Sequence, residues 1–215
     1  GIRRYLVDQG WAPERVHYLP NFVEPIASPD GVATVPGMRP EGRNIFAAGR
    51  LHKNKGFDVL IRALPMVVDA HLCIAGSGPL ERQLRALAAQ IGVADRITWV
   101  GWLESPADYY RATDVFVCSS RHEPLGNVIV EAWAYGAPVV AAASHGPVEL
   151  INDGTDGLLV PINDPARLAK AISTVLAQPA LQQSLTAAGR ERHLESFAKE
   201  AVLDQYMNFF EGIVA

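Results

Sequence analysis

The sequence has little of several features that mark particular classes of protein. Only two of its 215 residues are cysteine, and both lie in apolar runs, which disfavours a disulfide-built secreted scaffold and indicates a reducing cytoplasm. Lys and Arg (19) are fewer than Asp and Glu (23), and with a formal charge of -4 we expect no nucleic-acid partner. No apolar run is long enough to span a bilayer, and we expect no signal peptide.

Two signatures of cofactor-dependent enzymes are also missing. There is no Asp-x-Asp pair to chelate a metal-bound diphosphate, and the histidines lack metal-binding spacing, so we predict a metal-independent protein. The turn Gly76-Ser77-Gly78-Pro79 begins like a dinucleotide fingerprint, but its third glycine would fall at Glu81. No acidic residue closes the next strand, so an NAD-binding domain is disfavoured.

What the sequence does contain, from residue 44 onward, is an alternation of short apolar strands and helices. Six strands are expected, at residues 45–48, 71–75, 97–100, 115–118, 138–142 and 158–160. Helices are expected at residues 57–68, 80–91, 107–111, 128–135, 147–151, 165–177, 180–195 and 198–213. This alternation predicts an α/β fold with a Rossmann-like, doubly wound parallel sheet and extra C-terminal helices. Ligands of such a sheet bind at the C-terminal ends of its strands.

The first 43 residues are less regular. We expect a helix over residues 3–9 that ends near Gly10, and a short strand within residues 15–23. Residues 24–43 are rich in proline and glycine, which predicts a loop or linker. The chain starts without methionine, so we expect it to be part of a longer protein.

The most informative stretch joins the strand at 115–118 to the helix at 128–135. Glu123 and Glu131 bracket this turn, and free amides at the start of the helix favour an anion. The two carboxylates would repel a phosphate, so we expect them to accept hydrogen bonds from neutral hydroxyls. Alternatively, each glutamate is an ordinary helix-terminal or surface charge. A ligand with both phosphates and hydroxyls indicates a nucleotide, most simply a sugar nucleotide.

Other loops after the strands add to this pattern. Arg50 and Lys55 follow the first strand, and a planar guanidinium with a compact ammonium can hold a diphosphate. Taken alone, the same loop is more typical of a solvated basic turn. The glycines at 76 and 78 let backbone approach a ligand closely. Gly101, directly after Val100, leaves room for a flat base or simply ends the strand.

Taken together, these segments resemble the family 4 glycosyltransferases, which are retaining enzymes of the GT-B fold. The resemblance covers essentially the whole chain, as the C-terminal, donor-binding domain of that family. It rests on five segments in the family's order: residues 19–23, 49–56, 76–79, 123–131 with the glutamate spacing intact, and 154–160. Each motif alone is weak, whereas the ordered set is specific.

The resemblance implies a role for each site residue. Arg50 and Lys55 would stabilise the donor diphosphate, and with Glu123, which would contact the transferred sugar, they form the implied catalytic set. Glu131 would bind the ribose hydroxyls, and backbone at Val100 would meet the base. The remaining implied donor-binding positions are Gly49, Gly76, Gly78, Leu125, Gly126 and Asn127. The donor would be a UDP-, GDP- or ADP-sugar, with no metal, and no general base is implied.

The resemblance also implies a domain plan. Residues 1–43 would be a leading segment and linker from an N-terminal acceptor domain, residues 44–197 the nucleotide-sugar domain, and residues 198–215 a helix that packs on the other domain. Without that domain, the chain is expected to bind donor but to turn over poorly. The apolar face of the last helix is a candidate surface for self-association, formed by Val202, Tyr206, Phe209, Phe210 and Ile213.

The implied function is retaining transfer of a hexose-type sugar to a glycan or lipid acceptor, in bacterial surface polysaccharide or lipopolysaccharide synthesis. The full-length protein would be cytoplasmic or at the cytoplasmic face of the inner membrane. Two alternatives stay open: another GT-B enzyme, such as a phosphorylase or sugar-nucleotide epimerase, and a non-catalytic nucleotide-binding or interaction module. Residue types do not give the base, the sugar, the acceptor or the linkage.

Overall fold

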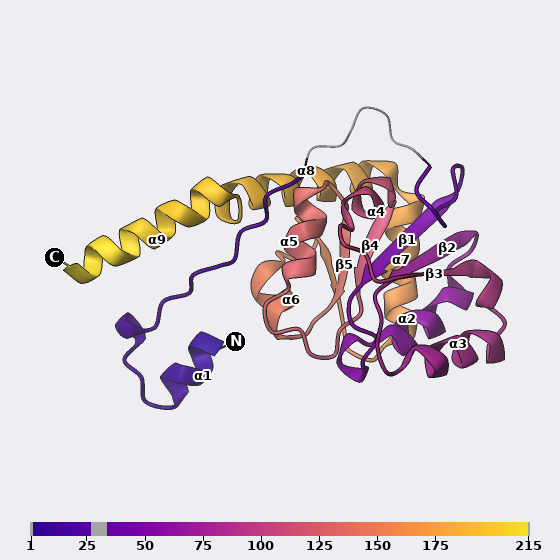
Figure 1. Cartoon of the computed structure of the whole chain (residues 1–215), viewed down its shortest axis with the longest axis horizontal. Helices are drawn as coiled ribbons and strands as arrows, with labels where there is room; N and C mark the ends of the chain where they lie inside the picture. The colour runs from indigo at the N-terminus through magenta and orange to yellow at the C-terminus, as the bar shows by residue number, and fades with distance from the viewer. Residues whose placement is uncertain (1, 27–33, 215) are drawn as a thin grey trace.

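The computed structural model of the chain describes residues 2–26 and 34–214 (Figure 1). Its centre is a sheet of six parallel strands in the order β3-β2-β1-β4-β5-β6. Their bounds are Arg43–Ala48 (β1), Ala70–Ala75 (β2), Ile97–Gly101 (β3), Val115–Cys118 (β4), Val139–Ala142 (β5) and Leu158–Val160 (β6). The strand order reverses between β1 and β4, which confirms the doubly wound fold and creates a switch point where a ligand crevice forms.

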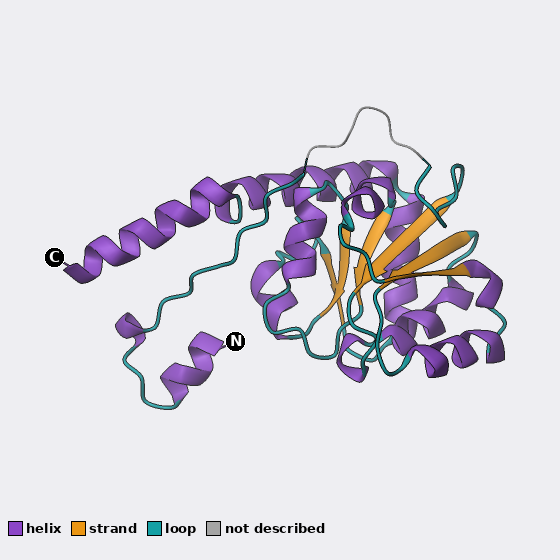
Figure 2. Ribbon diagram, in the orientation of Figure 1, coloured by secondary structure: helices purple, strands orange, loops and turns teal. Residues whose placement is uncertain are grey.

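Helices cover both faces of the sheet (Figure 2). The bounds of the α-helices are Ile2–Asp8 (α1), Phe57–Ala63 (α2), Glu81–Gln90 (α3), Ala107–Ala112 (α4), Asn127–Ala134 (α5), His145–Leu150 (α6), Pro165–Ala177 (α7), Pro179–Ser196 (α8) and Lys199–Val214 (α9). Short 3-10 turns lie at Pro13–Arg15 (η1), Lys53–Lys55 (η2), Leu64–Met66 (η3) and Ala94–Arg96 (η4).

The strands are apolar along their length because both of their faces are buried. On β1, Ile45 and Ala47 pack into a core with α2, α3 and α7, whereas Phe46 packs into a second core with α4 and α5. Neighbouring side chains of a strand point to opposite faces, so each strand contributes to both cores. This double burial explains why the sequence shows continuous apolar runs rather than alternation.

The six strands and most of the helices lie where the sequence predicts them, but two elements differ. The strand expected within residues 15–23 is wrong, since this segment does not join the sheet and instead contacts α9 at His17 and the end of α8 at Val23. Its Val23 amide donates to Phe197 O (3.1 Å), and Val23 O lies 2.8 Å from His193 Nε2. The helix expected to reach residue 68 ends at Ala63 and continues as η3, because Pro65 has no amide hydrogen to donate.

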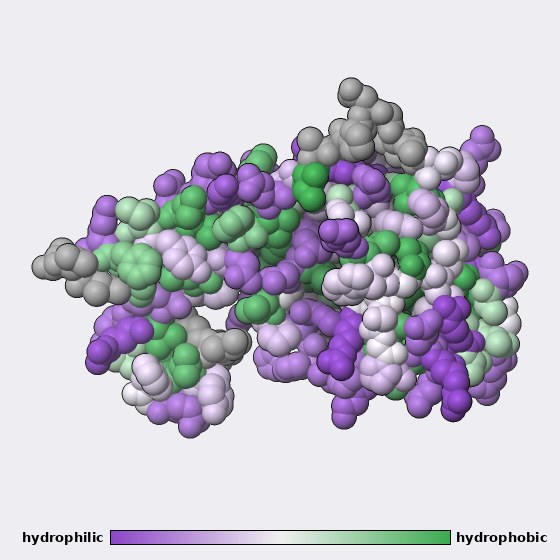
Figure 3. Space-filling model, viewed as in Figure 1, coloured by the Kyte–Doolittle hydropathy of each residue, from purple (hydrophilic) through white to green (hydrophobic). Residues whose placement is uncertain are grey.

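Helix α8 lies across one end of the sheet (Figure 1). Helix α8 packs against α5, where Trp133 meets Gly189, and α9 continues outward (Figure 1). On the face that Figure 3 shows, apolar side chains gather along α9. Of the predicted apolar face, Phe210 is 54% exposed, Tyr206 and Phe209 are half-buried and Val202 is buried. The side chain of Ile213 lies outside the described residues.

Within the described residues, no helix combines the length and the apolar character needed to cross a membrane.

Candidate functional site

A cavity of about 650 Å³ opens at the C-terminal ends of β1, β2 and β3, where the fold places a ligand crevice. This volume is within the range of about 300–1,000 Å³ that small-molecule sites occupy. Five predicted site residues line it: Gly49, Arg50, Gly76, Gly78 and Glu131. The other lining residues are Ala48, Ala75, Ser77, Trp102, Leu103, Glu104, Pro106 and Val128.

Closely packed backbone forms one wall of this cavity. Gly76 has φ +125°, and a Cβ built there would lie 2.0 Å from Gly49 O. A Cβ at Gly78 would lie 2.5 Å from Leu51 O, and the Leu51 amide donates to Ser77 O (2.9 Å). Larger residues would separate the loops, so these two glycines are required for the wall. The Arg50 side chain extends from it into solvent.

Glu131 reaches the same cavity from α5. Its Oε2 accepts a hydrogen bond of 2.9 Å from the Tyr110 hydroxyl. Burial raises the pKa of the Glu131 carboxyl, while the Tyr110 hydrogen bond and the charge of Lys55 oppose that rise. The site thus combines a half-buried carboxylate with an exposed guanidinium, Arg50, on the opposite loop.

Lys55 and Glu123 do not line the cavity but form an ion pair beside it. Lys55 Nζ lies 2.5 Å from Glu123 Oε2, and the two side chains are 24% and 9% exposed. Ser120 Oγ donates to the same carboxylate oxygen at 3.3 Å. The structure therefore joins two predicted catalytic residues that the sequence could not pair.

The loop that carries Lys55 is fastened to the loop that carries Glu123. Gly56 has φ +64°, and a Cβ there would lie 2.1 Å from Ser119 O. Ser119 Oγ donates to Lys55 O (2.9 Å), and the Arg121 amide donates to Asn54 O (2.7 Å). The two loops leave β1 and β4 side by side at the switch point, which explains why they meet.

A second fastening joins these loops to α2. Arg121 donates to both carboxylate oxygens of Asp58 at 2.7 Å each, and these hydrogen bonds lower the pKa of Asp58.

Four residues at or beside the site were not predicted from the sequence: Arg121, Asp58, Tyr110 and Trp102. Only Trp102 gave a signal, since it follows a predicted strand end, whereas the others depend on contacts between distant segments.

The start of α5 stands next to the Lys55–Glu123 pair. Gly126 is buried with φ +73°, Leu125 is 44% exposed, and Asn127 Oδ1 accepts from Asn21 Nδ2 at 3.4 Å. The Asn21 contact brings the segment at residues 19–23 to this helix. Leu125, Gly126 and Asn127 do not line the 650 Å³ cavity, and neither does Val100, whose neighbours Trp102 to Pro106 form that wall instead.

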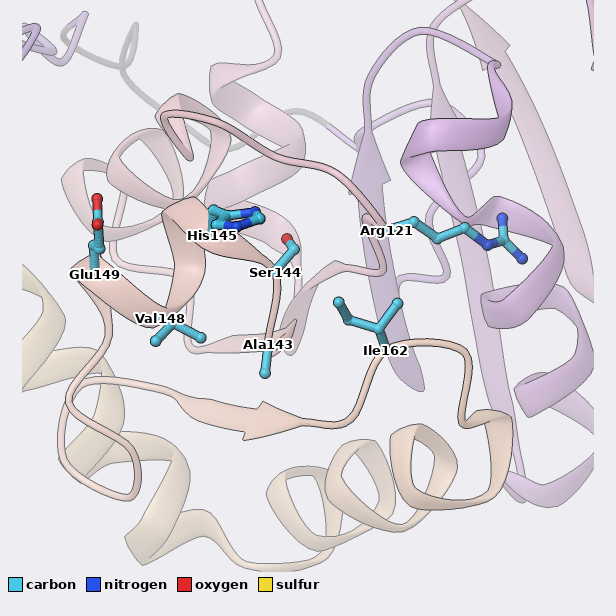
Figure 4. A pocket seen from close by; sticks show the side chains of 7 residues that line it. All are labelled: Arg121, Ala143, Ser144, His145, Val148, Glu149 and Ile162. Carbon is cyan, nitrogen blue, oxygen red and sulfur yellow. The ribbon is translucent and has the colours of Figure 1, made fainter. Parts of the chain in front are cut away.

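A second cavity, of about 420 Å³, lies at the ends of β4, β5 and β6 (Figure 4). It is lined by Arg121, Ala143, Ser144, His145, Val148, Glu149 and Ile162. The Arg121 guanidinium points away from it, toward Asp58. The sequence predicted none of these residues as site residues.

Metal binding was predicted to be unnecessary. Across residues 2–26 and 34–214, no three His, Cys, Asp or Glu side chains gather in a way that could hold an ion. Metal independence stays a prediction.

Comparison with known proteins identifies the family. A family model described as "Glycosyl transferases group 1" matches residues 42–178. The lipopolysaccharide core biosynthesis glycosyltransferase LpsE of Rhizobium meliloti (strain 1021) is 36% identical over 210 residues, which are 96% of this chain and 61% of that protein. LpsD of the same organism, also a lipopolysaccharide core biosynthesis glycosyltransferase, is 37% identical over 80% of this chain and 50% of its own length. The chain thus spans less than two thirds of these relatives.

Solved structures agree with the fold. Sucrose-phosphate synthase from Thermosynechococcus elongatus superposes with a TM-score of 0.85 at 28% identity, over 100% of this chain and 57% of its own. HepE of Anabaena, in complex with UDP-glucose, gives 0.85 at 22% identity, over 98% of this chain and 61% of its own. Because the family model matches more than half of the chain and the parallel sheet agrees with these folds, the chain belongs to the group 1 glycosyltransferases, the GT-B-type family that its motifs indicate.

Proposed function

We propose that this chain is the donor-binding half of a retaining glycosyltransferase that takes a hexose-type sugar from a UDP-, GDP- or ADP-sugar. The observation that supports this most directly is the 650 Å³ cavity, which gathers Arg50, Glu131 and the glycine loops at the switch point. Its mixture of an exposed guanidinium, carboxylates and glycine backbone matches a ligand with a diphosphate and hydroxyls.

In this proposal the nucleoside lies in the cavity and the diphosphate lies toward α5. Glu131 accepts hydrogen bonds from the ribose, and Arg50 and Lys55 contact the diphosphate oxygens. As the sugar leaves, negative charge grows on the nucleotide, and cations already in place stabilise it. Lys55 is held 2.5 Å from Glu123, so a bound donor would share this ammonium with Glu123.

The acceptor is proposed from the relatives. LpsE and LpsD are named for lipopolysaccharide core biosynthesis, and a further structural neighbour is the lipopolysaccharide outer core galactosyltransferase WaaB. We therefore propose a glycan or lipid-linked saccharide acceptor in surface polysaccharide synthesis. The domain divisions after residues 43 and 197, the cytoplasmic or inner-membrane location and the self-association through residues 198–213 stay predictions.

The test is a thermal-shift panel with UDP, GDP, ADP and their sugar conjugates in EDTA. A ligand that binds only the folded chain stabilises it by about 2.7 kcal/mol at a hundredfold excess over Kd. We expect one nucleoside diphosphate to raise the melting temperature, and Arg50→Ala and Glu131→Gln to reduce that rise. Arg82→Ala, an exposed arginine on α3, is the matched control.

Two results would count against the proposal: no nucleotide stabilises the chain, or Arg50→Ala responds like Arg82→Ala. A non-catalytic module would pass this binding test. Sugar transfer by the longer protein, abolished by the same substitutions, separates the enzyme from that alternative.

A further inference from the structure

Glu131 extends from α5 into the 650 Å³ cavity, but the group that orients its carboxylate lies on α4. The Tyr110 hydroxyl is 2.9 Å from Glu131 Oε2 and 3.3 Å from Val128 O. Since a phenol has one proton to donate, the shorter distance and the acceptor's charge favour the carboxylate. Tyr110 itself is completely buried.

The ring of Tyr110 is held on several sides by other aromatic rings. It stacks on Tyr135 at 5.8 Å between centroids with an interplanar angle of 10°. Phe46 meets it edge-on at 5.1 Å, and Phe116 is tilted against it at 5.0 Å. With the ring fixed by these contacts, the hydroxyl has one position relative to Glu131.

The same short helix also supports the cavity wall. Trp102, Leu103, Glu104 and Pro106 line the cavity, and α4 begins at the next residue, Ala107. The Tyr110 amide donates to Pro106 O (3.1 Å). The loop that forms part of the cavity wall therefore runs directly into the helix that carries the hydrogen-bond donor to Glu131.

We propose that Tyr110 is a positioning residue of the donor site, whose hydroxyl holds Glu131 Oε2 so that Oε1 is free to accept from the ribose hydroxyls of the donor. This inference rests on the proposed function, because it takes Glu131 as the ribose-binding residue. Its consequence is selectivity: the chain should bind a ribonucleotide more tightly than the deoxyribonucleotide, and Tyr110 should contribute to that difference.

The experiment measures the affinity of the chain, by calorimetry, for UDP, GDP and ADP, each against its 2′-deoxy counterpart. Tyr110→Phe removes only the hydroxyl and keeps the ring contacts. Tyr109→Phe is the matched control on α4, because its hydroxyl donates to Pro36 O at 2.9 Å and not to Glu131. A purely structural role would weaken ribonucleotide and deoxyribonucleotide binding alike, so the ratio of the two affinities is the decisive value.

We expect Tyr110→Phe to lower the affinity for the bound ribonucleotide about tenfold, as loss of a hydrogen bond to a charged group does, and to lower the affinity for the 2′-deoxyribonucleotide, which keeps only the 3′-hydroxyl, by less. Tyr109→Phe should keep the wild-type ratio. The double variant Tyr110→Phe, Glu131→Gln should lose no more than Glu131→Gln alone, because the hydroxyl acts through that carboxylate.

Two outcomes would overturn the inference, and they are distinguishable. If Glu131→Gln removes the ribose preference but Tyr110→Phe keeps the wild-type ratio, Tyr110 does not position Glu131 and the proposed function stands. If Glu131→Gln itself leaves the ratio unchanged, the ribose role of Glu131 is wrong, and the inference about Tyr110 falls with it.

Discussion

The ion pair between Lys55 and Glu123 leads to the most specific prediction about this site. Lys55→Met removes the ammonium and keeps most of the stem, and Glu123→Gln removes the charge while keeping the shape. The implied contact of Lys55 with the donor diphosphate predicts that its replacement weakens nucleotide binding. The 2.5 Å contact adds a cost in stability, because Glu123 is only 7% exposed and has Ser120 as its other side-chain donor among the described residues.

The magnitude follows from the burial of the two side chains. Fully exposed pairs contribute about 0.2–1 kcal/mol, whereas removing one partner of a fully buried pair costs about 3–5 kcal/mol. This pair lies between those cases, with side chains 24% and 9% exposed. We expect either single substitution to lower the free energy of unfolding by about 2 kcal/mol, with a coupling energy of about 1 kcal/mol between them.

The assay is urea unfolding of the wild-type chain, both single variants and the double variant. Lys53→Met, an exposed lysine on the same loop, is the control and should stay within about 0.5 kcal/mol of wild type. Strictly additive single substitutions, or a Lys55→Met variant as stable as the control, would refute the reasoning. Nucleotide-induced stabilisation, measured on the same variants, should be lost with Lys55→Met and kept with Lys53→Met.

Three further predictions concern stability: two test close packing at glycines, and the third tests the burial of Tyr110. Gly56→Ala should lose more than about 2 kcal/mol in urea unfolding, because φ is +64° and its Cβ would meet Ser119 O at 2.1 Å; a neutral effect would contradict the loop contact. Gly189→Ala places a Cβ 2.3 Å from Trp133 Cδ1, and overpacking of about 1–3 kcal/mol should lower the melting temperature rather than raise it. Burial raises the pKa of Tyr110 well above its ordinary value, so the folded chain keeps a proton that the unfolded chain releases above about pH 10. Stability of the wild type should therefore fall with pH there by up to about 1.4 kcal/mol per pH unit more than in Tyr110→Phe, and equal slopes in alkaline unfolding would contradict this.

The architecture could be predicted from the sequence because strands that are buried on both faces appear as continuous apolar runs. Strands such as residues 115–118 are apolar at every position, and the helices between them carry their own start and stop residues. Where an extended segment pairs with no strand, the same kind of residue pattern predicts a strand that is not there. Residues 15–23 contain strand-forming residues, but they contact α8 and α9, which local pattern does not reveal.

Within the site, the sequence located the glycine loops, the two cations and the two glutamates, since each follows a strand end or begins a helix. It could not show that Lys55 pairs with Glu123, 68 positions away, or that Tyr110 donates to Glu131, 21 positions away. Nor could it show that Arg121 fastens the second loop to α2 through Asp58.

The sheet and the loops that carry chemistry could be predicted from the sequence, because they follow from the periodicity of burial and from residue types at strand ends, and the ordered motifs resembled the family. The tertiary structure decided which of those residues share a cavity and which are held by an ion pair. The reason is the reversal of strand order between β1 and β4, which brings loops from distant parts of the chain into contact. Distances between their side chains exist only once the sheet is assembled.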